Sequence, residues 1–222
     1  MKLIKPYTEI LTTINGSQIL KDIERVARTC YKSEDKISED TSSAEELIKK
    51  LIARGHEAMI EFGDITVKFV CDRGVSHEIV RHRVASYAQE STRYCNYGKS
   101  GEVTFIIPSW FKEPLYEYQI YLKHPESAIT DYAEQIWLEA MLSSEASYLD
   151  LLNDGWSPQQ ARSVLPNSLK TELNVKMNIR EWRHFFRMRC SKAAHPQMQE
   201  LTRPLLKQFQ ELIPVLFDDI TY

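Results

Sequence analysis

The chain has 222 residues, 43 % of them hydrophobic and 27 % charged, so it can build an ordinary folded core. We expect one domain over residues 1–222. The net charge of −3 argues against a surface dedicated to nucleic acid, because such surfaces are usually basic. The seven glycines form neither a G-x-G-x-x-G nor a G-x-x-x-x-G-K-[ST] motif, so if a phosphate is bound, we expect arginine side chains to bind it.

The N-terminal segment MKLIKPYTEI has no long apolar run of the kind found in signal peptides. No stretch approaches the roughly 18 apolar residues of a membrane span. The four cysteines are far apart in the chain and form no C-x-x-C pair, which argues against a zinc ribbon or a dithiol centre. We therefore expect a cytoplasmic protein that binds neither a membrane nor a metal ion.

Hydrophobic periodicity and capping residues predict strands and helices in a mixed order. Ser17 is the predicted cap of the first helix, Ser43 and Glu46 form a predicted capping box, and Ser157-Pro158 starts a later helix. In chain order we expect a strand and turn over 2–12, a helix over 19–31, a helix over 43–55, a strand over 64–71, a helix over 75–84, a strand over 102–107, a turn or helix over 114–123, a helix over 127–153, a helix from 157 that ends before 166, an extended segment over 168–177, a helix over 178–190 and a last helix over 196–217 with a break at Pro214. This order indicates an α+β or α/β protein.

The densest polar cluster is RHRVASYAQESTRYCNY, residues 81–97. Three adjacent cationic side chains on a helix point about 100° apart and would reach different partners. One interpretation is a solvated helix end at which Arg81 and His82 pair with Glu78. The added Ser91 and Arg93 favour a ligand site instead.

A second cluster is NIREWRHFFRMRC, residues 178–190. Trp182, Phe185 and Phe186 form an apolar stripe, and Arg189 is the next position on it. A guanidinium that points inward needs an anion, either in an internal salt bridge or on a bound phosphate. Arg180 and His184 share a neighbouring face and could bind a second ligand.

Two further segments give weaker indications of a functional site. Arg162 precedes a proline that ends a helix, where most arginines are solvated. His56-Glu57 follows Gly55, but position 60 is Ile60, so the H-E-x-x-H zinc motif is absent. The whole set is rich in arginine and aromatic residues, which suits planar anionic ligands better than hydrolysis.

These residues resemble a known family, the flavin-dependent thymidylate synthases. Their pattern is R-H-R, seven residues and a serine, and here Val84 to Glu90 separate Arg83 from Ser91. The resemblance extends over residues 56–190. It includes His56-Glu57, Arg93 with Tyr94, the Arg-x-x-Leu-Pro element at 162–166, and the spacing of Asn178, Arg180, His184 and Arg189.

The resemblance implies reductive methylation of dUMP to dTMP, with methylenetetrahydrofolate as the one-carbon donor and FAD, reduced by NADPH, as the hydride carrier. It implies an α+β fold with a mixed antiparallel sheet flanked by helices. It also implies a homotetramer whose active sites lie where subunits meet.

By position, the resemblance also assigns site residues. Those expected to bind dUMP are Glu78, Arg81, Gln89, Ser91, Arg93, Arg162 and Arg189. Those expected to bind FAD are Ala58, Glu61, Arg81, His82, Arg83, Gln89, Asn178, Arg180 and His184. Arg189, Ser91 and Arg93 are the expected catalytic residues, with Arg93 polarising the uracil and Ser91 binding and activating it rather than attacking it.

Three other functions are compatible with parts of the pattern. The chain could bind a nucleotide without catalysis, or bind RNA or DNA through residues 81–97. It could also be a scaffold in which a buried Arg189 pairs with a carboxylate. A visible flavin absorbance band in the purified protein would exclude most of these alternatives, and FAD-dependent turnover would separate the enzyme from a nucleotide-binding protein without catalysis.

Overall fold

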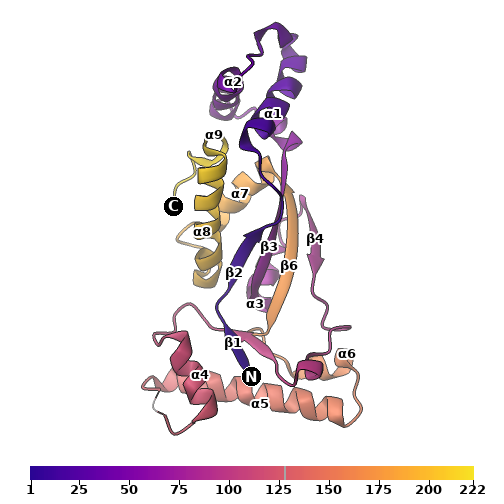
Figure 1. Ribbon diagram of the computed structural model, residues 1–222, viewed down its shortest axis with the longest axis vertical. Coiled ribbons are helices and arrows are strands. Elements are labelled where there is room, and N and C mark those ends of the chain that lie inside the picture. The colour runs from indigo at the N-terminus through magenta and orange to yellow at the C-terminus, as the bar shows by residue number, and fades with distance from the viewer. Residues whose placement is uncertain (128) are drawn as a thin grey trace. The chain divides into compact units, whose positions relative to one another are not determined.

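A computed structural model describes residues 1–127 and 129–222 and shows an α+β fold with two sheets (Figure 1). By their internal contacts, the described residues form two compact units. Unit 1 comprises residues 1–7, 69–80 and 88–173, and unit 2 comprises residues 8–68, 81–87 and 174–222. The expectation of one domain over 1–222 stays a prediction.

The predicted elements are present, with shifted ends. The strands are β1 (Lys2–Ile4), β2 (Tyr7–Ile10), β3 (Asp64–Asp72), β4 (Ala85–Gln89), β5 (Thr104–Ile106) and β6 (Lys170–Asn178). The α-helices are α1 (Gly16–Tyr31), α2 (Ser42–Ala53), α3 (Arg73–Ile79), α4 (Leu115–Lys123), α5 (Tyr132–Asn153), α6 (Pro158–Ala161), α7 (Ile179–Arg189), α8 (Pro196–Leu212) and α9 (Pro214–Phe217). Short 3₁₀ helices are η1 (Glu34–Lys36), η2 (Glu57–Phe62), η3 (Tyr97–Ser100) and η4 (Arg162–Val164). Among the described residues, no helix is both long and apolar enough to cross a membrane.

The strands form a two-stranded and a four-stranded sheet. In unit 1, β1 pairs with β5 in parallel, with Leu3 opposite Phe105. The four-stranded sheet has the order β2-β3-β6-β4, so β6 lies between two strands that precede it in the chain. The sheets together are mixed, as predicted.

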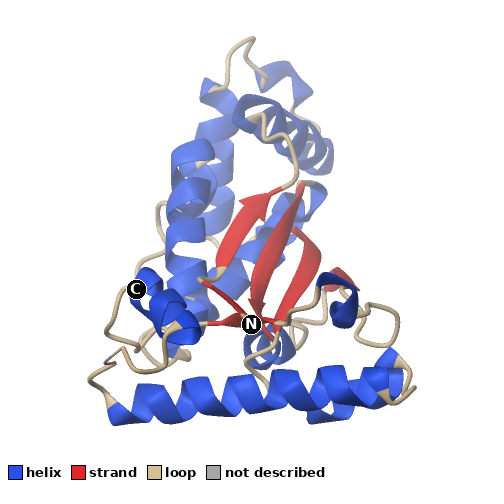
Figure 2. Cartoon of the chain, turned by 60° about the horizontal axis from the view of Figure 1, so that its bottom comes forward, coloured by secondary structure: helices blue, strands red, loops and turns tan. Residues whose placement is uncertain are grey.

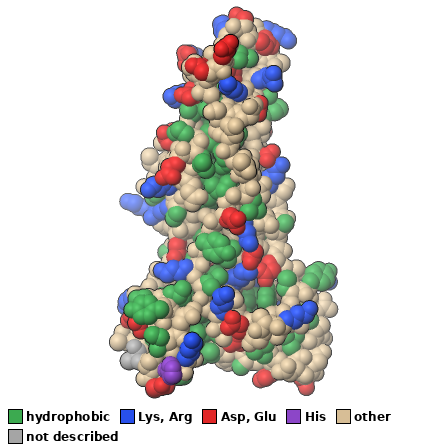
Figure 3. All heavy atoms as spheres, in the orientation of Figure 1, with side chains coloured by type: hydrophobic (Ala, Val, Ile, Leu, Met, Phe, Trp, Pro, Cys, Tyr) green, Lys and Arg blue, Asp and Glu red, His purple; other side chains and the backbone are tan. Residues whose placement is uncertain are grey.

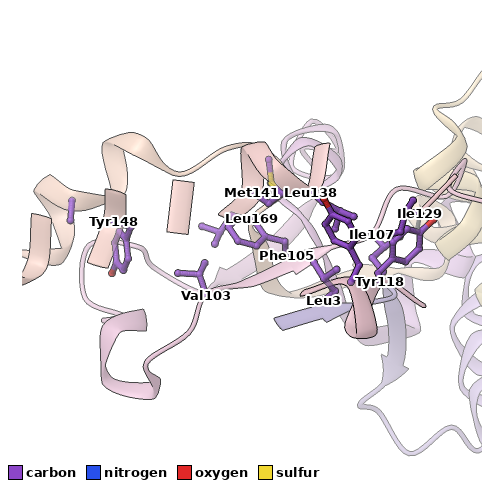
Figure 4. Close-up of a cluster of buried hydrophobic side chains, with 12 residues drawn as sticks. Leu3, Val103, Phe105, Ile107, Tyr118, Ile129, Leu138, Met141, Tyr148 and Leu169 are labelled. Atoms are coloured by element: carbon purple, nitrogen blue, oxygen red, sulfur yellow. The ribbon is translucent and has the colours of Figure 1, made fainter. Parts of the chain in front are cut away.

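The hydrophobic core of unit 1 lies between the two-stranded sheet and helices α4 and α5. Leu3 and Phe105 pack with Tyr118 from α4 and with Leu138 and Met141 from α5 (Figure 4). Figure 2 shows α5 as the long helix at the lower edge of the view. These side chains are almost fully buried, so α5 anchors the segments on either side of it by apolar burial.

The core of unit 2 is built on an aromatic stack. Trp182, Phe185 and Phe186 of α7 are fully buried, which confirms the predicted apolar stripe. The Trp182 ring lies 5.3 Å from the ring of Phe209 in α8, and its indole nitrogen donates to the carbonyl oxygen of Ile65 at 3.0 Å. This packing fixes α7, and therefore its polar face, against β3 and α8.

Two predicted helix caps are wrong. Asn15, rather than Ser17, caps α1, because its side-chain oxygen accepts from the backbone N–H of Gln18 at 3.1 Å. Ser43 does not open a capping box: α2 begins one residue earlier, and the Ser43 hydroxyl donates to the buried Glu24 at 2.9 Å. The need to satisfy a buried carboxylate therefore overrides the local capping pattern.

Two predicted helices are shorter than expected. The helix expected over 75–84 is α3, which ends at Ile79, so the R-H-R triplet lies in the loop before β4. The helix expected over 127–153 is α5, which begins after Asp131, whose side chain accepts from the N–H of Ala133 at 3.0 Å. Residue 128 of that range lies outside the described residues.

Candidate functional site

In unit 2, the R-H-R loop separates its three side chains by environment. Arg81 and Arg83 are exposed, whereas His82 is only 4 % exposed. The loop is not helical, so the interpretation of a solvated helix end paired with Glu78 is wrong for His82. The His82 side chain is therefore buried inside unit 2, whereas the Arg81 and Arg83 side chains lie at its surface.

His82 uses both ring nitrogens. Its Nδ1 lies 3.0 Å from a carboxylate oxygen of Glu181, and its Nε2 accepts from Nε of Arg189 at 3.1 Å. The ring also packs edge-on against Phe185, with 4.9 Å between ring centroids. Burial lowers the pKa of His82 below its usual value, although the hydrogen bond to Glu181 acts in the opposite direction.

A polar cavity of about 360 Å³ lies at the N-terminal end of α7. Arg180 is one of its lining residues and donates to Glu61 at 2.6 Å. Asn178 caps α7, because its side-chain oxygen accepts from the N–H of Glu181 at 2.8 Å. The lining residues are Glu57, Glu61, Val84, Asn178, Arg180, Glu181, His184 and Arg187.

Unit 1 contains a second polar cavity, of about 460 Å³. Its walls include Arg73, from the first turn of α3, and Arg162, from η4. Arg162 donates to the hydroxyl of Thr92 at 2.9 Å. The Nη1 atom of Arg73 is buried and has no hydrogen-bond partner among the described residues. Two guanidinium groups at one cavity, one of them with a buried nitrogen that has no partner among the described residues, are suited to binding an anion.

The end of β4 and the segment after it carry three more of the predicted substrate residues of unit 1, Gln89, Ser91 and Arg93. Gln89 donates to the hydroxyls of Ser76 at 3.0 Å and Thr171 at 3.2 Å, so its amide is held between α3 and β6. Ser91 begins a turn in which its hydroxyl oxygen accepts from the N–H of Arg93 at 3.3 Å. The Arg93 guanidinium is exposed and lies 5.4 Å from the centroid of the Tyr94 ring.

The predicted site residues divide between the two units. Glu78, Gln89, Ser91, Arg93 and Arg162 belong to unit 1. Ala58, Glu61, Arg81, His82, Arg83, Asn178, Arg180, His184 and Arg189 belong to unit 2. Within unit 2, four of the expected flavin residues line one cavity, and His82 and Arg189 are hydrogen-bonded to each other. Ala58 is exposed in η2, next to the cavity residue Glu57.

The arginine buried in a salt bridge is not the one that the sequence indicated. Arg183 is fully buried and pairs with Asp219, whereas Arg189 is partly exposed and binds His82. The apolar stripe of α7 does not continue to Arg189, because the helix ends there and its last turn faces the R-H-R loop.

Two site residues were not singled out from the sequence. Arg73 places a cation in the first turn of a helix, where the helix dipole disfavours it, and this anomaly could have marked it. Glu181 gave no such signal, because its partner His82 lies 99 positions away in the chain.

Ligand atoms of His82, Glu181 and His184 lie within 4.8 Å of one another, the spacing of a metal site. Both nitrogens of His82 are already hydrogen-bonded, one of them to a cation. The arrangement is therefore that of a hydrogen-bonded chain, and we assign no metal to it.

Charge is mixed on the face of the molecule that Figure 3 shows. On the face shown in Figure 3, Lys and Arg side chains alternate with Asp and Glu, and hydrophobic side chains lie among them. A nucleic-acid surface would gather the basic residues instead, so this face gives no support to DNA or RNA binding.

Comparison with known proteins identifies relatives over most of the chain. Residues 11–215 match the family model described as thymidylate synthase complementing protein. A flavin-dependent thymidylate synthase of Corynebacterium aurimucosum is 34 % identical over 199 residues, which cover 89 % of this chain and 78 % of the relative. The flavin-dependent thymidylate synthase of Geobacter sulfurreducens is 30 % identical over 198 residues, covering 87 % and 78 %.

A solved structure has the same fold. It is a UMP/dUMP methylase, PolB, from Streptomyces cacaoi bound with 5-Br dUMP, with a TM-score of 0.76 and 22 % sequence identity. The match covers 98 % of this chain and 96 % of the other. The α+β architecture predicted from the sequence is therefore that of a known fold.

Proposed function

Because the chain belongs to the family of flavin-dependent thymidylate synthases, we propose that it methylates dUMP to dTMP, with methylenetetrahydrofolate as the one-carbon donor and FAD, reduced by NADPH, as the hydride carrier. The names of the relatives support a flavin and the reaction. The sequence resemblance is the basis for three further assignments: the folate as the one-carbon donor, NADPH as the reductant, and FAD as the form of the flavin.

The observation in this structure that carries the proposal is the arginine pair of unit 1. Arg73 and Arg162 line one cavity, and the buried Nη1 of Arg73 has no hydrogen-bond partner among the described residues. A phosphate monoester supplies the acceptor oxygens and negative charge that such a group needs. We assign this cavity to the 5′-phosphate of dUMP, with Gln89 and Ser91 on the neighbouring segment.

The cavity of unit 2 is the proposed flavin site. Its donors are Asn178, Arg180 and His184, and its carboxylates include Glu61. An isoalloxazine ring edge carries carbonyl oxygens and an N–H group, so a lining with both donors and acceptors fits it. The exposed Arg81 and Arg83 of the R-H-R loop suit the diphosphate. When bound, the flavin supplies the hydride chemistry of the reaction.

Three residues are proposed to act on the pyrimidine. Arg93 and Arg189, which the sequence resemblance assigns to the substrate, are proposed to place positive charge near the carbonyl oxygens of the uracil. This charge stabilises the enolate-like form of the ring and so makes C5 more nucleophilic toward the one-carbon unit. Ser91 donates its hydroxyl to the substrate rather than attacking it, since its oxygen already accepts from the N–H of Arg93. The role of Glu78 and Arg81 is to bind dUMP.

We propose that the protein is a homotetramer in which each site takes residues from more than one subunit. Exposed apolar residues recur at helical spacing on two helices of unit 1, Tyr116 and Ile120 on α4 and Tyr132 and Ile136 on α5. Such stripes are typical of subunit contacts. The four cysteines are free thiols, which fits the proposed cytoplasmic location.

Purified protein tests the proposal directly. We expect a flavin absorbance band that elutes with the protein, and NADPH oxidation that changes when dUMP is added. Protein that binds no flavin after incubation with FAD, and that oxidises no NADPH with dUMP and methylenetetrahydrofolate present, would overturn it. Size-exclusion chromatography with light scattering tests the tetramer separately.

A further inference from the structure

The hydrogen bonds around His82 fix its protonation. The Nε of an arginine carries a hydrogen and can only donate, so Nε2 of His82 must offer its lone pair over the 3.1 Å to Arg189. Neutral imidazole then carries its proton on Nδ1 and donates it to Glu181 over 3.0 Å. The three residues therefore form a chain of hydrogen bonds in which Arg189 donates to His82 and His82 donates to Glu181.

We propose that Glu181 is a positioning residue: through His82 it selects the tautomer that holds the Arg189 guanidinium in place for the substrate. This inference rests on the proposed function, because it takes Arg189 to act on dUMP. Neither the resemblance nor the comparisons assign a role to Glu181.

The backbone of Glu181 is fixed by the helix cap, because its N–H donates to the side-chain oxygen of Asn178 at 2.8 Å. Glu181 lies in the first turn of α7, where the helix dipole favours an anion. Both partners of the His82 ring lie on α7, at its beginning and its end, and the fully buried Phe185 between them packs against the same ring. The spacing of Glu181 and Arg189 is thus set by the helix.

Protonation of His82 would break this chain. A second proton would sit on Nε2 and face the N–H of Arg189, with the two positive charges about one hydrogen bond apart. The groups facing the ring are Glu181, Arg189, His184 at 5.6 Å between ring centroids, and Phe185, and the Tyr87 hydroxyl donates to the His82 carbonyl oxygen. Burial favours the neutral ring, which keeps the pKa of His82 below its usual value.

The tautomer is measurable without turnover. The chain has six histidines, and magic-angle-spinning ¹⁵N NMR of histidine-labelled, sedimented protein at pH 7.5 reports the proton position of each. The His82→Gln variant identifies the His82 signals by their absence. We expect His82 to be neutral with its proton on Nδ1, and expect Glu181→Ala to shift it toward the Nε2–H form. A wild-type His82 with Nε2 protonated would overturn the inference, whether or not the protein methylates dUMP.

Kinetics then test the link to Arg189. We expect Glu181→Ala to lower kcat/KM for dUMP by about 10- to 100-fold and Glu181→Asp to restore part of it. The matched control is Glu46→Gln, at an exposed Glu46–Lys50 pair of α2, which should behave as wild type. A tautomer shift without a kinetic loss would refute positioning. A kinetic loss without a tautomer shift would show a merely structural role. An inactive wild type would instead refute the proposed function.

Discussion

Arg183 is completely buried in α7, and its two terminal nitrogens, Nη1 and Nη2, each donate to a different carboxylate oxygen of Asp219 at 2.7 Å. Nη1 also donates to the carbonyl oxygen of Leu216, so the guanidinium fastens α7 to the segment around α9. A buried guanidinium without its anion is strongly destabilising. This pair, rather than Arg189, is the internal salt bridge of α7.

We expect Asp219→Ala to lower the free energy of unfolding by about 1–3 kcal/mol. The effect is smaller than for a fully buried pair, because the Asp219 side chain is 47 % exposed and Glu57 remains 3.8 Å from Nε of Arg183. Denaturant unfolding of the purified protein measures it. The neighbouring Asp218→Ala, an exposed carboxylate with the same change in charge, is the control. Equal stabilities of the two variants would contradict the assigned role.

The same pair predicts a pH dependence. Hydrogen bonds from Arg183 lower the pKa of Asp219 below its usual value. A lowered folded-state pKa gives stability that is complete above the unfolded pKa of about 3.9 and is lost as pH falls through the folded pKa. The stability difference between wild type and Asp219→Ala should therefore be constant near neutral pH and shrink in acid below that value. A difference that grows in acid would contradict this sign.

Arg73→Ala should weaken binding of dUMP about tenfold or more. It should leave the binding of deoxyuridine, which has no phosphate, almost unchanged. Because the substitution removes an unsatisfied buried nitrogen, we expect no large loss of stability. Calorimetric titration with both ligands measures the selectivity, with Lys123→Ala, at the end of α4, as the control. Equal losses of affinity for dUMP and deoxyuridine would show that this cavity does not bind the phosphate of dUMP.

Arg189→Ala should reduce dUMP binding far more than it reduces fold stability, because the proposed partner of this guanidinium is the substrate. Arg189 lies at the end of α7 and is partly exposed, and its hydrogen bond to His82 is one of the contacts that the substitution removes. Parallel measurements of dUMP affinity and of the unfolding temperature decide the point. A variant that unfolds easily, yet binds dUMP normally when folded, would contradict the prediction.

The cysteines should differ widely in reactivity. Burial raises the pKa of Cys71 to about 12, so at pH 8 only about one molecule in ten thousand carries the reactive thiolate. Cys30 is exposed. Brief alkylation with iodoacetamide followed by peptide mass mapping should label Cys30 and leave Cys71 unmodified until the protein is denatured. Early labelling of Cys71 would show that β3 is not buried as described.

The sequence predicted the elements that depend on local patterns. The stripe of Trp182, Phe185 and Phe186 and the break before Pro214 are properties of neighbouring residues, and both are confirmed. The cap at Ser17 failed because Asn15, an equally good cap two residues earlier, competes for the same helix start.

The geometry of the candidate site was less accessible from the sequence. His82 lies in a loop rather than in the predicted helix, where its ring forms hydrogen bonds with Glu181 and Arg189 of α7, roughly a hundred positions later in the chain. The position of Arg73 in the first turn of α3 could have drawn attention to it, but the burial of its Nη1 is known only from the structure. Such contacts come from tertiary packing, which periodicity does not encode. The residue types of the site were predictable, but their partners were not.

Formation of dTMP is the most direct test of the account. Protein loaded with FAD is supplied with NADPH, methylenetetrahydrofolate and dUMP, and the nucleotides are separated and weighed by mass spectrometry. We predict a product heavier than dUMP by one methyl substitution, absent without dUMP and strongly reduced in Arg189→Ala. Unchanged dUMP from flavin-loaded, folded protein, under conditions in which a known flavin-dependent thymidylate synthase makes dTMP, would contradict it.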